Sequence, residues 1–325
     1  MLERLLRVGR RLFSDTPAMQ LPRPAVLDPI TPRVLMIVHN PTIPAEDGRR
    51  LNQVLGWHDP DALASRYIAD LRDASNGFLN YRISERIDAD WFSPKVDGFR
   101  YTPESYLAGW RARRMHTPDQ IDYPAQVARF NLIERYERHE FDEVWFFAFP
   151  YAGDYESTMV GNGAFWCNSP PVPHTEHCHG RFVMMAFNYE RDAGCMLENF
   201  GHRVESIMSH VYRNMAPPHN LWQRFTRYDA IAPGASHCGN VHFAPNSQAD
   251  YDWGNRRMVL SYCDDWLTFP EMPGRARPVN ATEWGGGDMR LHHLWWLRHL
   301  PCTTGQTNGI ANNWWQYIVD PNRCD

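Results

Sequence analysis

Val34-Leu-Met-Ile-Val38 decides the fold, because it is a short, unbroken apolar run that ends directly in the polar residues His39 and Asn40. A run of this kind is typical of a strand that is buried on both faces of a parallel sheet. Parallel sheets bind their ligands beyond the carboxyl ends of their strands. We therefore expect Asn40 to contribute to a binding site.

Three further apolar runs, with helical patterns between them, give the chain a β-α rhythm. The runs are Leu79–Ile83, Val144–Phe149 and Phe182–Phe187, and the helical patterns lie near residues 61–73, 104–114 and 124–139. This alternation predicts an α/β fold with a predominantly parallel sheet flanked by helices, doubly wound in the Rossmann or flavodoxin-like manner. A (β/α) barrel is the alternative, and it too places its site at the strand ends.

The chain divides by composition into two parts. Residues 1–32 predict an arginine-rich N-terminal helix and a proline-rich strap, and residues 33–325 predict a single α/β domain. Within this domain, residues 214–325 are loop-rich, with short strand-like pieces near 240–243 and 258–262. Long ordered loops in a compact domain usually carry function.

Composition excludes several classes of protein. Apolar residues make up 43% of the 325 residues and charged residues 22%, which is typical of a folded chain. A net charge of -5 and the absence of a basic run argue against a nucleic-acid partner. No apolar stretch is long enough for a membrane span or an export signal, so we expect a cytoplasmic protein. The oligomeric state is left open.

Lysine and cysteine usage narrows the chemistry further. Lys95 is the only lysine, which disfavours a Walker loop and a pyridoxal enzyme. The seven cysteines include no C-x-x-C pair, so reduced thiols are expected. No cofactor motif is present, although a divalent metal fits the patterns described next.

Carboxylates follow two of the predicted strands. Glu156 and Glu190 come shortly after the runs that end at Phe149 and Phe187, and Tyr155 and Asn188 beside them are candidate binding residues. One carboxylic acid and one carboxylate at the same sheet edge could divide general acid and base work. Ion pairs with nearby arginines are the alternative.

A predicted helix from Cys195 to Tyr212 carries an unusual polar stripe. At about 100° per residue, its apolar side chains fall on one side, and Glu198, His202 and Glu205 fall on nearly the opposite side. The stripe contains no arginine or lysine, whereas a solvated face usually mixes both signs of charge. Carboxylates beside an imidazole predict a divalent metal or a proton relay, with a solvated face as the alternative.

A second helix, Asp288–Leu300, repeats this layout with His292 and Trp296 opposite its leucines. It follows Glu283-Trp-Gly-Gly-Gly287, and we include His292 among the candidate metal ligands and Glu283 among the catalytic carboxylates. Trp284 and Trp296 are candidate binding residues, because tryptophan beside polar residues can stack on a sugar-like ligand. Core packing is the alternative.

Two shorter segments also contain reactive side chains. Pro173–His179 holds three histidines and a cysteine, which are ligand types that suit zinc, but in the spacing of no standard zinc finger. Ser236–His242 offers a serine or cysteine nucleophile with a histidine base, but the flanking Gly234-Ala-Ser-His-Cys-Gly239 is one residue too long for a G-x-S-x-G elbow.

Asn188-Tyr-Glu190 and Thr282-Glu-Trp-Gly285 resemble the acid/base and nucleophile signatures of the large barrel clan of retaining glycosidases. The resemblance covers a few residues, and Tyr189 stands between the asparagine and the glutamate, which are adjacent in that clan. It implies Glu190 as acid/base and Glu283 as nucleophile.

The sequence thus supports three hypotheses. The first is a hydrolase of a polar, carbohydrate-like small molecule that uses Glu190 and Glu283, with Glu156 in reserve. The second is a metal-dependent enzyme that uses Glu198, His202 and Glu205 with His292. The third is a non-catalytic binding or assembly protein.

Overall fold

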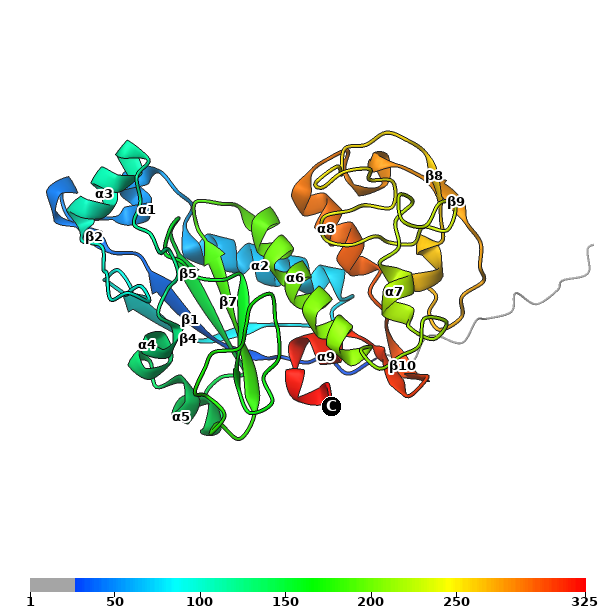
Figure 1. The fold of residues 1–325 in the computed structure, drawn as a ribbon, viewed down its shortest axis with the longest axis horizontal. Coiled ribbons are helices and arrows are strands. Elements are labelled where there is room, and N and C mark those ends of the chain that lie inside the picture. The colour runs from blue at the N-terminus through cyan, green and yellow to red at the C-terminus, as the bar shows by residue number, and fades with distance from the viewer. Residues whose placement is uncertain (1–26) are drawn as a thin grey trace, which may run out of the picture.

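The computed structural model describes residues 27–325, and a five-stranded sheet forms the centre of this part of the chain (Figure 1). The strands lie in the order β4 (Arg82–Ala89), β1 (Arg33–His39), β5 (Glu143–Ala148), β7 (Arg181–Asn188) and β6 (Ser157–Gly161). The first four are parallel and β6 runs antiparallel to β7. The expected α/β class with a mostly parallel sheet is confirmed, and the sheet is open, with β4 and β6 at its edges.

Helices cover both faces of the sheet, as the unbroken apolar strands require. On β1, Met36 points into the core shared with α2 (Pro60–Ala74) and α6 (Ala193–Val211), and Ile37 points into the opposite core. That second core is completed by α4 (Tyr123–Arg129) and α5 (Leu132–Glu137). Each such apolar side chain stabilises the fold by about 1.5–3 kcal/mol when fully buried.

The remaining elements are short. They are β2 (Thr42–Ile43), η1 (Pro44–Glu46), β3 (Arg49–Arg50), α1 (Leu51–Leu55), α3 (Pro103–Ala112), α7 (Leu221–Phe225), β8 (Val259–Ser261), η2 (Cys263–Trp266), β9 (Arg277–Val279), η3 (Ala281–Trp284), α8 (Met289–Arg298), β10 (Cys302–Thr307), β11 (Ile310–Asn313), α9 (Trp315–Val319) and η4 (Pro321–Arg323). Only two-stranded pairings occur outside the central sheet in the described residues.

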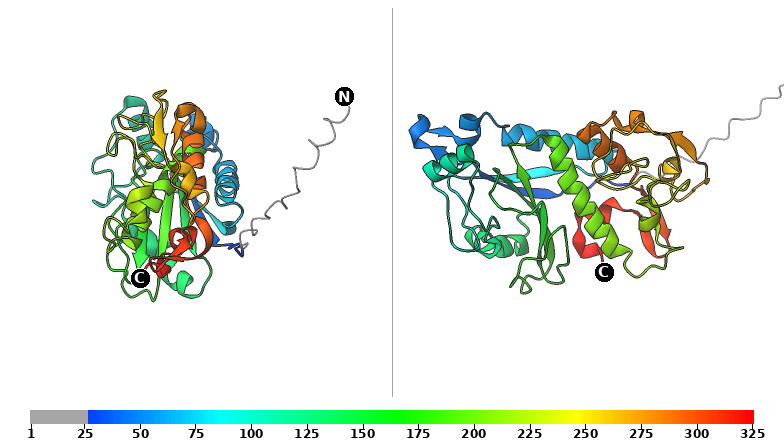
Figure 2. Two further views of the ribbon diagram at one scale, coloured as in Figure 1. Left: turned by 90° about the vertical axis from the view of Figure 1, so that its right-hand side faces the viewer. Right: turned by 45° about the horizontal axis from the view of Figure 1, so that its top comes forward.

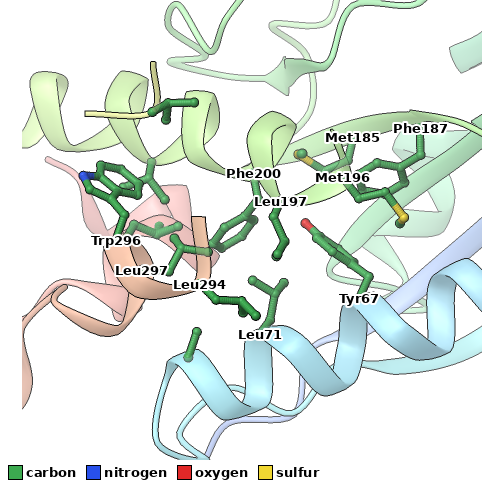
Figure 3. Close-up of a cluster of buried hydrophobic side chains, with 14 of the residues drawn as sticks. Tyr67, Leu71, Met185, Phe187, Met196, Leu197, Phe200, Leu294, Trp296 and Leu297 are labelled. Atoms are coloured by element: carbon green, nitrogen blue, oxygen red, sulfur yellow. The ribbon is translucent and has the colours of Figure 1, made fainter. Parts of the chain in front are cut away.

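The loop-rich C-terminal part packs against α6 on the side away from the sheet (Figures 1 and 2). Leu71 of α2, Phe200 of α6 and Leu297 of α8 belong to the hydrophobic cluster in Figure 3, which joins the three helices. Arg290 of α8 adds a hydrogen bond of 2.7 Å from Nε to Asp70 of α2. Helix α6 is therefore shared between the sheet and the C-terminal loops.

Several local expectations differ from the structure. The strand expected at 79–83 is β4, displaced toward the C-terminus; it is a largely exposed edge strand and therefore lacks an apolar run. The helix expected at 124–139 is interrupted at Asn131, whose φ of 49° is left-handed, and gives α4 and α5. Residues 240–243 form a turn instead of a strand, and β6 was not expected.

No helix within residues 27–325 combines the length and apolar character needed to cross a membrane. The expected N-terminal helix and most of the proline-rich strap lie outside the described residues.

Candidate metal site and adjoining cavity

A cavity of about 590 Å³ lies at the carboxyl ends of β5 and β7, beside the first turns of α6. This is where a parallel sheet is expected to bind its ligand. The polar and charged residues that line it include Asp154, Glu156, Asn188, Arg191, Glu198 and Tyr251. The cavity is therefore bordered by several carboxylates from the strand ends and from α6.

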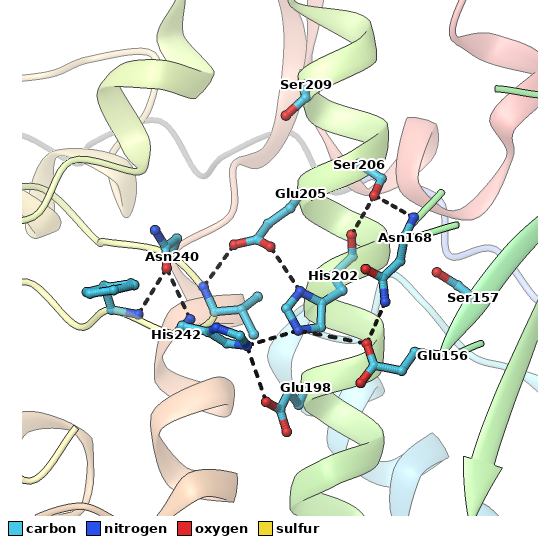
Figure 4. A network of polar contacts seen from close by, with 12 residues as sticks. Glu156, Ser157, Asn168, Glu198, His202, Glu205, Ser206, Ser209, Asn240 and His242 are labelled. Atoms are coloured by element: carbon cyan, nitrogen blue, oxygen red, sulfur yellow. Dashed lines mark hydrogen bonds and ion pairs between the residues drawn. The ribbon is translucent and has the colours of Figure 1, made fainter. Parts of the chain in front are cut away.

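The polar stripe of α6, formed by Glu198, His202 and Glu205, does not simply face solvent. Other parts of the chain pack against it (Figure 4). The helix begins after Asp192, whose side chain accepts a hydrogen bond from the Gly194 amide. From this start, Glu198, His202 and Glu205 face residues 240–251 and Glu156. The structure thus brings together the three α6 residues that the sequence nominates as metal ligands.

A pair of histidines forms the centre of this cluster. The Nε2 atoms of His202 and His242 lie 3.1 Å apart. The Nδ1 atom of His202 lies 3.1 Å from Glu205, and the Nδ1 atom of His242 lies 3.0 Å from Asp250. When each Nδ1–H donates to its carboxylate, two neutral rings direct their Nε2 lone pairs at each other. A cation between the two Nε2 atoms removes this repulsion.

A carboxylate completes a set of three ligands. Glu198 Oε1 lies 3.5 Å from His242 Nε2, and one ligand atom from each of Glu198, His202 and His242 lies within 4.8 Å of the others. Two histidines and one glutamate hold the catalytic zinc of known metallopeptidases. With Zn–N bonds of about 2.05 Å, the observed Nε2 separation corresponds to an N–Zn–N angle of about 100°. The residues present therefore fit a divalent cation.

The carboxylates of the cluster shift its acid–base properties. Burial raises the pKa of Glu198, and the nearby negative charge of Glu156 raises it further. Burial alone would lower the pKa of His202, but the hydrogen bond and the charge of Glu205 outweigh burial and raise it. A concentration of negative charge around two imidazoles favours a cation.

Glu156 stands next to the three ligands without belonging to the set. Its Oε2 atom is 3.8 Å from His202 Nε2 and accepts a hydrogen bond of 2.5 Å from the Asn168 side-chain amide. Asn168 is itself held on α6, because its backbone amide donates to Ser206 Oγ over 2.9 Å. Glu156 is therefore positioned between the candidate metal site and the cavity that it lines.

The turn that carries His242 approaches α6 closely at Gly201. A Cβ atom on Gly201 would lie 2.5 Å from Val241 Cγ2. The Val241 amide donates to Glu205 Oε1 over 3.0 Å, and Asn240 Oδ1 accepts from the His242 amide over 3.0 Å. A glycine in α6 thus allows the turn to lie against the helix, and hydrogen bonds fix it there.

Tyr251 covers the outer side of the cluster. Its ring centroid is 4.3 Å from that of His242, its hydroxyl bonds to Glu198, and it also lines the cavity. Its φ of 59° is unusual for a tyrosine and marks backbone strain at the site.

The floor of the cavity is built around the buried Lys95. Its Nζ atom lies 2.6 and 2.8 Å from the backbone and carboxylate oxygens of Asp119, and 2.6 and 2.7 Å from the carbonyl oxygens of Tyr151 and Ala152. Gly153 follows with a φ of 91°, where a Cβ atom would collide with the Asp119 carbonyl. Lys95 therefore holds the segments around Asp119 and Tyr151 together, and every proton of its ammonium group is hydrogen-bonded.

The two carboxylates proposed first from the sequence do not line the cavity. Glu190 lies in the turn after β7, where its backbone amide donates a hydrogen bond of 2.9 Å to Asn188 Oδ1. Glu283 lies in η3 and is held by Arg277 through contacts of 2.8 and 3.1 Å. Of the nominated catalytic carboxylates, Glu156 lines the cavity, as does Asn188 among the nominated binding residues.

The other nominated residues have local structural contacts. Trp284 and Trp296 are buried, and their indole N–H groups donate to the carbonyl oxygens of Trp253 and Gly239. Tyr155 stacks on Tyr123, with ring centroids 5.9 Å apart.

Asn40 and His292 do not line the cavity, and each contacts a neighbouring side chain instead. Asn40 exchanges hydrogen bonds with Asn52 at the start of α1. His292 is fully buried and stacks on Trp253 at 5.1 Å, and burial holds its pKa far below the usual range.

A second group of possible ligands, Cys263, Asp264 and His299, is less suited to a cation. Arg277 holds the Asp264 carboxylate at 2.7 Å and lowers its pKa. Burial raises the pKa of the Cys263 thiol to about 11 and lowers that of His299 to about 4. The negative charge of this group is thus already neutralised by an arginine. The histidines of the 173–179 segment, by contrast, are exposed.

The sequence patterns do not identify the whole set. They indicate His242 only as a base for a nearby nucleophile, and they give no sign that Asp250, Tyr251 and Asp154 belong to the site. These four residues lie in loops, where no periodicity indicates which side chains face the site.

No family model and no curated protein matches the chain. A solved structure described as "Structure of a chaperone-substrate complex" is similar over 55% of this chain and 24% of its own, with 12% sequence identity and a TM-score of 0.27. A likeness at that TM-score carries no argument about fold or function.

Proposed function

We propose that this protein is a metal-dependent hydrolase in which Glu198, His202 and His242 hold a divalent cation, and that its substrate is a polar small molecule bound in the adjoining cavity. The observation that carries the proposal is the pair of Nε2 atoms 3.1 Å apart, each on a ring whose Nδ1 atom contacts a carboxylate. Carboxylate–histidine–metal arrangements of this kind are typical of protein metal sites.

The surroundings of the three ligands suit hydrolysis. A divalent cation at such a site acts as a Lewis acid and lowers the pKa of bound water to about 7. Glu156, oriented by Asn168, is then the base that accepts a proton from the attacking water. Tyr251 lines the same cavity, and its hydroxyl bonds to Glu198, one of the three proposed ligands.

The carbohydrate-directed hypothesis remains a prediction with less support. Its first-choice carboxylates, Glu190 and Glu283, do not line the cavity, and Glu283 is occupied by Arg277. A saccharide can still be the polar substrate of the metal-dependent enzyme. We further propose that the fold is doubly wound and flavodoxin-like, because the four parallel strands lie in the spatial order second, first, third, fourth along the chain.

Metal binding tests the proposed site directly. We expect the purified chain to bind about one Zn²⁺, Mn²⁺ or Fe²⁺ ion, measured by elemental analysis and by calorimetric titration. His202→Asn and His242→Asn should each abolish stoichiometric binding, while the exposed His219→Asn should not. A content below about 0.2 ions per chain after loading with each metal would count against the proposal.

Activity tests the role of Glu156 separately. On a panel of amide and ester substrates, Glu156→Gln should lower kcat by about 10²- to 10⁴-fold, because it removes the base. Its metal content should stay close to that of the wild type, because Glu156 is not among the three ligands. Loss of metal in this variant would instead make Glu156 a ligand.

A further inference from the structure

Asp154 is a charged group in the cavity wall that the proposed hydrolytic machinery does not use. It lies two residues before Glu156 and lines the same cavity. Both of its carboxylate oxygens are buried, and neither has a hydrogen-bond partner within residues 27–325. A buried carboxylate without a donor is costly, so its presence calls for a ligand group.

Two side chains close enough to affect the charge of Asp154, Lys95 and Tyr123, are already engaged elsewhere. Lys95 has three protons and already faces four oxygens at 2.6–2.8 Å, from Asp119, Tyr151 and Ala152. The Tyr123 hydroxyl accepts a hydrogen bond of 2.6 Å from the Tyr155 amide, and its own proton is directed at the Tyr155 carbonyl oxygen. Apart from the backbone amide of Asp154 itself, residues 27–325 therefore offer this carboxylate no hydrogen-bond donor.

The distribution of charge in the cavity also favours a cationic ligand group at Asp154. Asp119 is paired with Lys95, and Glu156 and Glu198 belong to the cluster around the two histidines. Arg191 is the only basic residue among the described residues that line the cavity, and no ion pair joins it to Asp154 there. Among the carboxylates of residues 27–325 that line the cavity, Asp154 is thus the one that contacts neither Lys95 nor the two histidines.

Burial raises the pKa of Asp154 to about 7, although the positive charge of Lys95 acts in the opposite direction. The group is therefore close to half ionised near neutral pH without a ligand. A cation brought next to it favours the ionised form and forms a charge-assisted hydrogen bond. A ligand with an ammonium group satisfies both the geometry and the charge.

We propose that the cavity selects substrates that carry a primary amine, and that Asp154 pairs with this ammonium group while the scissile carbonyl lies at the cation held by Glu198, His202 and His242. The inference rests on the proposed function. It names amino-acid amides, amino-acid esters and short peptides with a free amino group as the substrate class.

Matched hydroxamic acids test this inference without a known substrate. Hydroxamates bind the cation directly, so a short series ending in a primary amine can be compared with counterparts of equal length that end in a methyl group. Calorimetric titration of the zinc-loaded full chain at about pH 8, above the pKa of Asp154, gives both affinities. At the best length we expect the amine to bind at least about tenfold more tightly.

The variant Asp154→Asn should remove this advantage and leave the affinity of the methyl-ended series unchanged. The exposed Asp28→Asn is the control and should behave like the wild type. Equal affinities of the two series for the wild type at every length would overturn the proposal, and this comparison needs no variant. An amine advantage that persists in Asp154→Asn would overturn it as well.

The methyl-ended series separates this inference from the proposed function. If these compounds bind zinc-loaded protein and the amine adds nothing, the metal site stands and the role of Asp154 is wrong. If neither series binds, the proposed metal site and the inference that rests on it both fail.

Discussion

Glu205 and Asp250 determine which nitrogen atoms of the two site histidines face each other. Each carboxylate contacts an Nδ1 atom, at 3.1 Å for His202 and 3.0 Å for His242, so the Nε2 atoms are left toward the candidate cation. Such hydrogen bonds orient the ring and raise the basicity of the ligand. In the proposed site, these two carboxylates therefore act on the candidate cation through the histidines.

Replacing one of these carboxylates should weaken metal binding without removing a ligand. For Glu205→Gln we expect Zn²⁺ affinity to fall by about 10- to 100-fold, because the charge beside His202 is lost while Oε1 can still accept from the Val241 amide. Calorimetric titration measures the change. The exposed Glu176→Gln is the control, and an unchanged affinity in Glu205→Gln would contradict the role assigned to Glu205.

At this scale the sequence indicates only one part of the candidate site. Glu198, His202 and Glu205 could be nominated because helix periodicity places them on one stripe, and the structure brings them together. His242 and Asp250 could not be paired with that stripe. Their positions depend on a loop that folds back over α6, and no local pattern in the chain encodes that contact.

Helix α6 positions the site because it allows a close approach at Gly201. Alanine normally stabilises a helix relative to glycine by about 1 kcal/mol. At this position, however, the added Cβ atom would meet Val241 Cγ2 at 2.5 Å. Gly201→Ala should therefore displace the turn that carries His242 and weaken Zn²⁺ binding by at least about tenfold.

A second substitution provides the control for this steric argument. Val241→Ala removes the methyl group that Gly201→Ala would strike, so the double variant should recover most of the metal affinity. Titration of the wild type, both single variants and the double variant measures the coupling between the two positions. Equal losses in Gly201→Ala and in the double variant would show that the contact with Val241 is not the cause.

Helix α6 is also tied to the sheet by a buried ion pair. Arg203 Nη1 lies 2.7 Å from Glu143 of β5, close but outside hydrogen-bond alignment, and both side chains are almost completely buried. Arg203 also donates to the carbonyl oxygens of Ile318 and Val319 in α9. One side chain thus links the sheet, α6 and the C-terminal helix.

Removing this arginine should destabilise the whole fold. For Arg203→Met we expect the free energy of unfolding to fall by about 3–5 kcal/mol, because Glu143 becomes an uncompensated buried charge. Urea unfolding followed by circular dichroism measures the loss. Arg138→Met, at an exposed ion pair, should cost less than about 1 kcal/mol. A similar small loss in Arg203→Met would mean that the buried pair contributes little.

Elements were predictable where the apolar pattern is strong. The patterns that predict β1, β5, β7 and α6 have the periodicity of the structure they form. The exposed edge strand β4 has no apolar run, and the break at Asn131 depends on a single left-handed residue. Both lack a periodic signal, which explains why their bounds were misplaced.

Buried neutral histidines link the stability of the whole molecule to pH. Burial lowers the pKa of His39 and His299 to about 4 and that of His237 to about 3. In the unfolded chain a histidine binds its proton near pH 6.5. Between these values the unfolded state holds more protons than the folded state. The contribution of these neutral histidines to the free energy of unfolding is therefore complete above about pH 6.5 and is lost as the pH falls toward 4.

His39→Gln tests this linkage. With metal removed by chelation, we expect the slope of unfolding free energy against pH, between about pH 6.5 and 4, to decrease by up to about 1.4 kcal/mol per pH unit. Urea unfolding at several pH values gives the slope, which is independent of any uniform loss of stability. The exposed His58→Gln is the control. An unchanged slope in His39→Gln would show that His39 does not titrate in this manner.

Lys95 gives the folded molecule an unusual chemical property. It is the only lysine in the sequence, and its ammonium group is buried under the cavity and bonded to four oxygens. Reagents that acylate lysine amines can reach this side chain only when the loop containing Tyr151 and Ala152 opens. The rate of acylation at Lys95 would therefore measure, at a single atom, how often the loop beneath the cavity opens.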